Sequence, residues 1–92
     1  MFIVVSYDIK MNEKGGSVLQ QTFKICKKYL FRLQKSVFIG ELSKCEFEDL
    51  KCELNHCIRK IDKCDIIVAK NIKNIVHYDV SKHYECDKTL IL

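Results

Sequence analysis

The alternation between two kinds of hydrophobic repeat is the feature of this sequence that most restricts its fold. Within the first 70 residues, short segments with apolar residues at every second position alternate with segments that repeat every three or four positions. The first period is that of a β-strand and the second is that of an α-helix. Because every segment is short, we expect strands and helices to follow one another within one small domain.

Three segments carry the strand pattern, and a fourth carries it more weakly. Phe2 to Asp8 alternates an apolar set of residues with a set that ends in the Asp8 carboxylate. Arg32 to Leu42 also has period two, which fits either one bent strand or two short strands. Asp65 to Lys70 is a further β-branched run, and a weaker strand pattern covers Ile75 to Val80.

Two segments carry the helix pattern. Ser17 is the expected N-cap of the first helix, whose apolar stripe comprises Leu19, Phe23, Cys26 and Leu30. The second helix is expected to begin with a capping box, in which the side chains of Ser43 and Glu46 each accept a hydrogen bond from the other residue's backbone amide. Its apolar stripe comprises Phe47, Leu50, Leu54, Ile58 and Ile61.

This order of elements predicts an α+β fold, the ferredoxin-like βαββαβ sandwich, with both helices on one face of the sheet. We expect residues 1–70 to form this core, and residues 71–92 to form an extra C-terminal strand and a tail. If Ile3, Val5 and Tyr7 face the helices, then Phe2, Val4 and Asp8 lie on the other face. An apolar sheet face without helices predicts packing against a second copy, as a homodimer.

Composition narrows the classes of partner. Sixteen Lys and Arg residues against twelve Asp and Glu give a net charge of +4, which favours nucleic acid without requiring it. No apolar run approaches the roughly 20 residues that cross a bilayer, and Asp8 interrupts the first apolar run too early for a secretory signal. We therefore expect a cytoplasmic protein with no membrane contact, in which the six cysteines are reduced and mostly buried.

Two motifs occur together, one at the end of the first predicted strand and one along the second segment with the strand pattern. The sequence Tyr7-Asp8-Ile9 closes the first strand, and the later run from Arg32 to Leu42 reads RLQKSVFIGEL. Together they resemble the Cas-two family of CRISPR-associated endoribonucleases, which are small dimeric proteins of CRISPR adaptation. The resemblance covers residues 1–70 and is also consistent with the ferredoxin-like core.

The resemblance implies a homodimer in which the Asp8 residues of both subunits flank one Mg²⁺ ion, or Mn²⁺. Mg²⁺ often takes one or two carboxylates and fills its remaining positions with water and phosphate, so paired Asp8 carboxylates suit it. Arg32 and Phe38 match positions near the cleavage site. There a guanidinium would neutralise phosphate and an aromatic ring would lie against a base or sugar.

The resemblance also implies partners. These are a CRISPR integrase subunit, duplex DNA and single-stranded RNA, and the C-terminal strand would join the sheet of the other subunit. Between the first strand and the first helix, where many members of the family carry arginines, this chain has only Lys10 and Lys14 as cations. Lysine offers a point charge in place of the bidentate arginine fork, so the phosphate contacts there are weaker.

Several interpretations stay open from the sequence. Asp8 is either a metal ligand or a strand-end carboxylate that accepts hydrogen bonds from loop amides. Phe38 either contacts the substrate or is buried in the dimer interface. The chain as a whole is either a metal-dependent phosphodiesterase of CRISPR adaptation, a non-catalytic DNA-binding adaptor, or a related ferredoxin-like toxin ribonuclease, and the two motifs favour the first.

Overall fold

The computed structural model describes residues 1–69 of the chain. The elements follow in the order β1 (Phe2–Asp8), α1 (Gly15–Tyr29), β2 (Phe31–Gln34), β3 (Val37–Glu41), α2 (Lys44–Cys57) and β4 (Lys63–Ala69). This confirms the ferredoxin-like α+β order, and the run from Arg32 to Leu42 contains two strands joined by a tight turn. The strand expected at Ile75 to Val80 lies outside the described residues.

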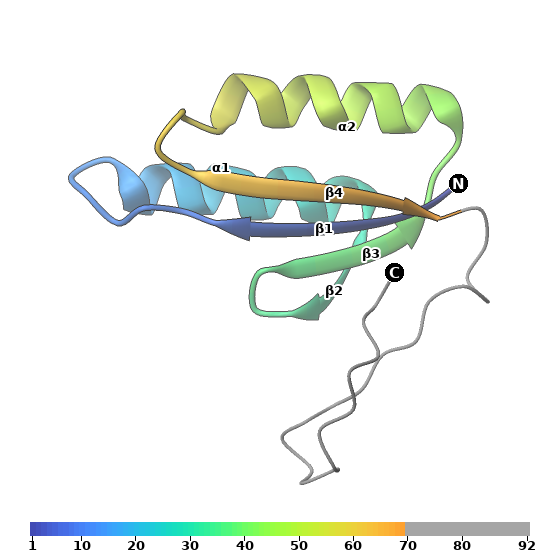
Figure 1. Ribbon diagram of the computed structural model, residues 1–92, viewed down its shortest axis with the longest axis horizontal. Helices are drawn as coiled ribbons and strands as arrows, with labels where there is room; N and C mark the ends of the chain where they lie inside the picture. Colours follow the sequence, from blue (N-terminus) through green and yellow to red (C-terminus); the bar gives the residue numbers. More distant parts are fainter. Residues whose placement is uncertain (70–92) are drawn as a thin grey trace, which may run out of the picture.

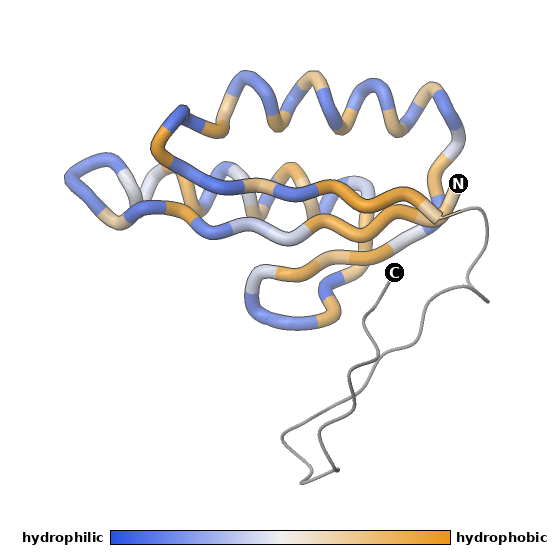
Figure 2. The backbone as a smooth tube through the Cα atoms, in the orientation of Figure 1, coloured by the Kyte–Doolittle hydropathy of each residue, from blue (hydrophilic) through white to orange (hydrophobic). Residues whose placement is uncertain are grey.

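The four strands form one antiparallel sheet in the order β2-β3-β1-β4, so that β1 is central. Helices α1 and α2 lie on the same side of this sheet (Figure 1). In Figure 2 the strands are most hydrophobic near the N-terminus of β1 and become more hydrophilic toward the other end. The polar end of the sheet is where β1 finishes at Asp8.

The core lies between the sheet and the two helices. Ile3 and Val5 of β1 are fully buried, and they belong to one cluster with Cys26 of α1 and with Leu50 and Leu54 of α2. Alternate residues of a strand face opposite sides, so this cluster fixes Ile3, Val5 and Tyr7 on the helix side, as expected. Within residues 1–69, no helix is long and apolar enough to cross a membrane.

Helix α1 begins earlier than the sequence predicts. Its N-cap is Lys14, which makes no side-chain capping bond, and Ser17 lies inside the helix. The start is set by Asn12, whose side-chain oxygen accepts a hydrogen bond from the Lys14 amide and whose carbonyl accepts one from Gly15. The chain is tight here, because a Cβ at Gly15 would lie 2.5 Å from the Lys10 carbonyl oxygen.

The buried face of α1 is correspondingly rotated from the expected stripe. Val18, Thr22 and Cys26 are buried, whereas Leu19 is 37% exposed and Phe23 is half-buried. The Thr22 hydroxyl donates a hydrogen bond to the Val18 carbonyl, which satisfies its polar atom inside the core. Leu19 of the expected apolar stripe is therefore not a core residue.

Helix α2 begins as predicted and ends sooner. The capping box is present, with the Glu46 amide donating to the Ser43 hydroxyl and the Ser43 amide donating to the Glu46 carboxylate. The helix ends at Cys57, so Ile61 lies in the following turn and is 54% exposed. The prediction that Ile61 continues the apolar stripe is wrong, because the chain turns there.

The sheet face opposite the helices carries an apolar row. The strand registers place Phe31, Ile39, Val4 and Ile67 side by side across all four strands. Phe31, at the β2 edge, is 78% exposed, whereas Val4 and Phe2 are only 4% and 5% exposed. The expected orientation of Phe2 and Val4 is thus confirmed, but the two side chains are more buried than an open face would leave them.

The cysteines divide into two groups. Cys26 is buried and Cys57 and Cys64 are half-buried, but Cys45 and Cys52 are exposed on α2, so the prediction of mostly buried thiols is wrong for these two. Burial raises the pKa of the Cys26 thiol to about 12 and that of Cys64 to about 11. All five cysteines of the described part are free thiols, and Cys86 lies outside it.

Candidate nucleic-acid site at the end of strand β1

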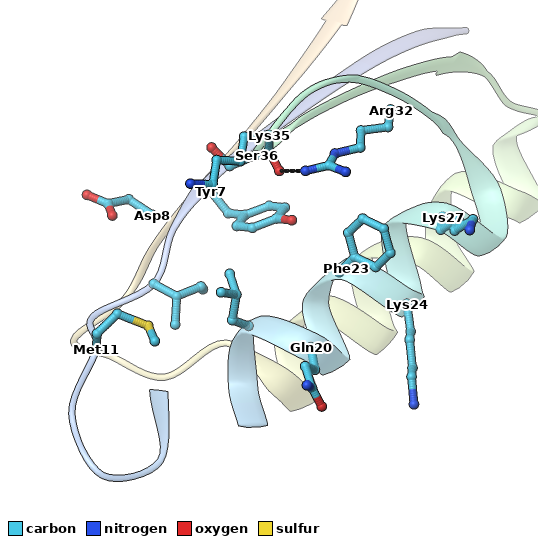
Figure 3. A pocket seen from close by; sticks show the side chains of 12 residues that line it. Tyr7, Asp8, Met11, Gln20, Phe23, Lys24, Lys27, Arg32, Lys35 and Ser36 are labelled. Atoms are coloured by element: carbon cyan, nitrogen blue, oxygen red, sulfur yellow. Dashed lines mark hydrogen bonds between the residues drawn. The ribbon is translucent and has the colours of Figure 1, made fainter. Parts of the chain in front are cut away.

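Asp8 is the last residue of β1 and its side chain is exposed. Its neighbours Tyr7 and Ile9 are buried in the core, so alternation directs Asp8 away from the helices. Figure 3 shows its carboxylate pointing away from the Tyr7 ring. The carboxylate forms no hydrogen bond or ion pair with any other residue of the described chain, which leaves it free to bind a cation.

The loop amides next to Asp8 are satisfied by other side chains. The Lys10 amide donates to an Asp62 carboxylate oxygen at 2.9 Å, and the Lys14 amide donates to the Asn12 side chain at 3.1 Å. The alternative interpretation, in which Asp8 accepts these loop amides, is therefore wrong. Asp62 takes the capping role that the sequence suggested for Asp8.

A second carboxylate lies near Asp8 on the same sheet face. In the β1–β4 register, Asp8 is directly opposite Lys63, and Ser6 is opposite Asp65. Asp65 is therefore the diagonal neighbour of Asp8, a relation in which antiparallel strands place Cα atoms about 7–8 Å apart. The sequence alone does not reveal that Asp65 lies near Asp8, because this neighbourhood depends on the strand register.

Whether a divalent cation fits beside Asp8 depends on the metal-binding side chains around it. No group of three or more His, Cys, Asp or Glu side chains that could hold a metal ion is present among residues 1–69. A cage built from one described chain is thus excluded, but an exposed, unpaired carboxylate suits Mg²⁺, which keeps several waters and accepts one or two carboxylates. Asp8 fits a metal site that water, phosphate or a second subunit completes.

A cavity of about 740 Å³ opens on the other side of β1. It lies between β1, α1 and the β2–β3 hairpin, as Figure 3 shows. Its apolar lining consists of Tyr7, Ile9, Met11, Leu19 and Phe23. Its cationic lining consists of Lys24, Lys27, Arg32 and Lys35.

Arg32 is held at the rim of this cavity. Its guanidinium donates hydrogen bonds to the carbonyl oxygens of Gln34 and Lys35, each at 3.3 Å. The guanidinium carbon also lies 5.2 Å from the centroid of the Phe23 ring, a cation–π distance. Arg32 is exposed and faces the helix side, so the structure places it on the opposite sheet face from the Asp8 carboxylate.

Phe38 is not available to a ligand. Its side chain is 0% exposed, because the register pairs it with Val5, which faces the helices. Its ring is stacked on Tyr7 with centroids 6.2 Å apart and meets Phe23 edge-on at 5.7 Å. The expected contact with a base or sugar and the alternative burial in a dimer interface are both inconsistent with this position. Phe38 instead supports the two rings that line the cavity.

Tyr7 is the site residue that sequence analysis missed most clearly. Its side chain is only 5% exposed, yet its hydroxyl forms no hydrogen bond with another described residue and lies at the cavity. Burial raises the pKa of this phenol, with a smaller contribution from Cys26 and an opposing one from the Arg32 charge. The hydroxyl therefore remains neutral near pH 7 and offers both a donor and an acceptor.

An arginine clasp fixes the loop that follows Asp8. The Arg59 guanidinium donates to the Lys10 carbonyl and to the Asn12 side chain, each at 2.8 Å, and it also pairs with Asp62. Hydrogen bonding from Arg59 holds the pKa of the Asp62 carboxyl well below its usual range. The clasp joins the turn after α2 to the loop after β1 and so sets where β1 ends.

Comparison with known proteins identifies the group to which this fold and site belong. The family model described as CRISPR associated protein Cas2 matches residues 1–75. The chain belongs to the Cas2 family. This confirms the resemblance drawn from the Tyr7-Asp8-Ile9 and Arg32 to Leu42 motifs, and it supports a CRISPR-associated role for the chain.

Relatives of this Cas2-family chain cover most of its length. The CRISPR-associated endoribonuclease Cas2 of Fusobacterium nucleatum is 43% identical over 72 residues, which are 77% of this chain and 68% of that protein. The CRISPR-associated endoribonuclease Cas2 1 of Moorella thermoacetica is 33% identical over the full length of both chains. The crystal structure of Streptococcus pyogenes Cas2 at pH 6.5 matches with a TM-score of 0.70 and 28% identity, covering 94% of this chain and 98% of that one.

Proposed function

We propose that this Cas2-family protein is a metal-dependent endoribonuclease or endonuclease of CRISPR adaptation, and that it acts as a homodimer with paired Asp8 carboxylates. The observation that carries the proposal is the unpaired, exposed Asp8 carboxylate at the end of β1, beside a cavity with a cationic rim. The relatives from F. nucleatum and M. thermoacetica are named endoribonucleases, which supports the same reaction class.

In this proposal Asp8 would hold Mg²⁺ or Mn²⁺. When bound, the ion supplies positive charge that polarises a phosphoryl oxygen and promotes attack by water. Arg32 and Lys35, which are exposed at the rim, attract the phosphates of the substrate. The Arg59 clasp keeps the loop after Asp8 in place, so that the carboxylate position is fixed before substrate arrives.

The apolar sheet face supports the homodimer. Asp8 lies on the same face as the row that contains Phe31, Ile39 and Val4, and Phe31 is 78% exposed. A two-fold axis through this face would place both Asp8 residues on the shared side, because a two-fold interface uses the same patch on both subunits. The strand expected within residues 71–92 lies outside the described residues, and in the proposed dimer it would join the partner's sheet.

A second candidate function is a non-catalytic adaptor that binds duplex DNA and a CRISPR integrase subunit. The observation that favours it is the sparse ligand set, because no cluster of three metal-binding side chains occurs in the described part of the chain. In an adaptor, the exposed lysines would contact DNA phosphates without base preference. DNA binding would then weaken steeply as the salt concentration rises.

The variant Asp8→Asn separates the two functions. We expect it to lose cleavage of single-stranded RNA or duplex DNA by orders of magnitude in Mg²⁺ or Mn²⁺, because it keeps the shape of Asp8 but removes the charge that attracts the cation. Asp49→Asn, an exposed aspartate on α2, is the matched control and should cleave like the wild type.

The outcomes are distinct. If the wild type shows no cleavage that chelator abolishes, or if cleavage survives in Asp8→Asn, the nuclease proposal fails. Retained binding of duplex DNA and of the integrase subunit by Asp8→Asn would then favour the adaptor.

A further inference from the structure

The cavity beside β1 exposes apolar surface that a small domain would normally bury. Met11 is 65% exposed and Leu19 is 37% exposed, and both line the cavity. The half-buried Phe23 lines it as well, with its ring braced from the core by Phe38 at 5.7 Å. Apolar side chains that gather around a hollow are typical of a ligand site.

The Tyr7 hydroxyl adds an accessible polar group to this apolar surface. Figure 3 shows the Tyr7 side chain extending from β1 toward Phe23 of α1. Tyr7 as a whole residue is 5% exposed, and its hydroxyl makes no hydrogen bond within residues 1–69. No buried side-chain nitrogen or oxygen of residues 1–69 lacks a hydrogen-bond partner, so the Tyr7 hydroxyl is accessible from the cavity and can take a partner there. A ligand with a hydrogen-bonding edge would supply one.

Cations stand on two separate walls of the cavity. Lys24 and Lys27 come from α1, whereas Arg32 and Lys35 come from the β2–β3 hairpin. Lys27 Nζ and the Arg32 guanidinium carbon lie 5.7 Å and 5.2 Å from the Phe23 ring centroid. Asp8 is the acidic residue of the lining, and its carboxylate points away. The cavity therefore favours an aromatic ligand that carries negative charge on two sides.

We infer that this cavity is a base-binding subsite for one unstacked nucleotide of a single-stranded nucleic acid. The base packs on Phe23 and Met11, its polar edge bonds to the Tyr7 hydroxyl, and the phosphates on its two sides meet the two groups of cations. We choose nucleic acid as the ligand because of the proposed function, and the inference rests on it in this respect. The volume of about 740 Å³ lies within the roughly 300–1,000 Å³ of ligand pockets.

Other nucleotide ligands fit this arrangement less well. A free mononucleotide carries its phosphate on one side only and leaves one cationic wall unused. A paired base in a duplex is stacked on both faces and would have to leave the helix to enter, which costs a few kcal/mol. The arrangement of the cations and the apolar lining therefore favours a nucleotide within a single strand as the ligand.

Binding of a fluorescein-labelled RNA decamer, measured by fluorescence anisotropy in EDTA, tests the subsite without cleavage. We expect Phe23→Leu to weaken binding of the single strand about tenfold, because base–aromatic stacking contributes about 1–3 kcal/mol per base. Binding of the same decamer in a duplex should change less than about twofold. Single-stranded DNA of the same sequence shows whether the ribose hydroxyl is also recognised.

Phe47→Leu is the matched control. Phe47 is a half-buried phenylalanine on α2, with Lys51 Nζ 4.7 Å from its ring centroid, and it lies outside the cavity lining. Phe47 with Lys51 is therefore a pair of the same kind as Phe23 with Lys27, but outside the cavity. Tyr7→Phe is the second variant, which keeps the ring and removes only the hydroxyl, and we expect it to weaken single-strand binding about two- to tenfold.

Three results would overturn the inference. The first is that Phe23→Leu and Phe47→Leu weaken single-strand binding equally. The second is that Tyr7→Phe and Phe23→Leu both bind the single strand as tightly as the wild type. The third is that AMP displaces the decamer at equal concentration. Far-UV circular dichroism checks that each variant is folded. If Phe23→Leu is not folded, the binding measured for Tyr7→Phe decides the test. The anisotropy assay measures binding in EDTA without cleavage, whereas the Asp8→Asn test measures cleavage, so failure of the subsite and failure of the nuclease proposal give different results.

Discussion

Removing the Phe38 ring should destabilise the domain severely. Phe38 is the largest fully buried side chain of the described residues. Its two ring contacts, with Tyr7 and Phe23, contribute about 0.5–1.5 kcal/mol each beyond burial. Burial of the side chain itself contributes about 1.5–3 kcal/mol. We therefore expect Phe38→Ala to lower the free energy of unfolding by about 3–5 kcal/mol, which is also the usual range for such a substitution.

Urea denaturation followed by far-UV circular dichroism at one protein concentration measures this effect. A domain of this size has a free energy of unfolding of about 5–15 kcal/mol, so Phe38→Ala should remain folded in water with a much lower midpoint. Phe38→Leu, which keeps most of the volume, should lose about 1–3 kcal/mol, mainly from the two ring pairs. Ile61→Ala is the exposed control and should lose less than about 1 kcal/mol, because Ile61 is 54% exposed.

Two results would contradict this prediction. The first is a free energy of unfolding of Phe38→Ala within about 1 kcal/mol of the wild type, and the second is an equal loss for Ile61→Ala. The first result would mean that Phe38 is not packed between the sheet and the helices, and the second would mean that the loss does not depend on burial. The support that we assign to it for the Tyr7 and Phe23 rings would then have no basis.

Two further predictions concern the clasp and the sheet face. The Arg59 guanidinium lowers the pKa of Asp62, so the carboxylate should stabilise the fold fully above the unfolded pKa of about 3.9 and progressively less as the pH falls below it. As the pH decreases from 5 toward 2, the thermal unfolding midpoint of the wild type should therefore fall more steeply than that of Asp62→Asn. Parallel plots of the two midpoints against pH would contradict this role of the clasp. Phe31→Asp should shift the proposed dimer toward monomer in sedimentation equilibrium, because Phe31 is the exposed end of the apolar row. Ile61→Asp is the control and should leave the dimer unchanged. If Phe31→Asp also leaves the dimer unchanged, the interface lies elsewhere.

Much of the fold is predictable because local signals and tertiary contacts agree. The limits of β1 follow from its alternation, and the start of α2 follows from Ser43 and Glu46, whose capping bonds are local to the helix end. The start of α1 is not predictable in this way. It depends on the turn at Asn12 and on the close passage of Gly15 past the Lys10 carbonyl, which the folded loop creates.

The candidate site shows the same division. The motif identifies Asp8 and Arg32 as positions of interest, and both are exposed. The alternation of β3 does not reveal which of its faces meets the helices, because Val37 and Ile39 are apolar on one side and Phe38 is apolar on the other. The pairing of Val5 with Phe38 decides the question in favour of the core. The roles of Tyr7 and Phe23 follow only from that packing.

Adjacent residues of β1 serve opposite sides of the sheet, with Tyr7 on the cavity side and Asp8 on the other. A substitution at one of them leaves the chemical composition of the other surface unchanged. If Asp8 serves cleavage and Tyr7 serves single-strand binding, as we propose, natural selection can abolish the first while preserving the second, or the reverse. A one-residue insertion in β1 is different, because it would exchange the two surfaces and damage both at once. The strand thus lets the two properties diverge through point mutation while it opposes changes in its own length.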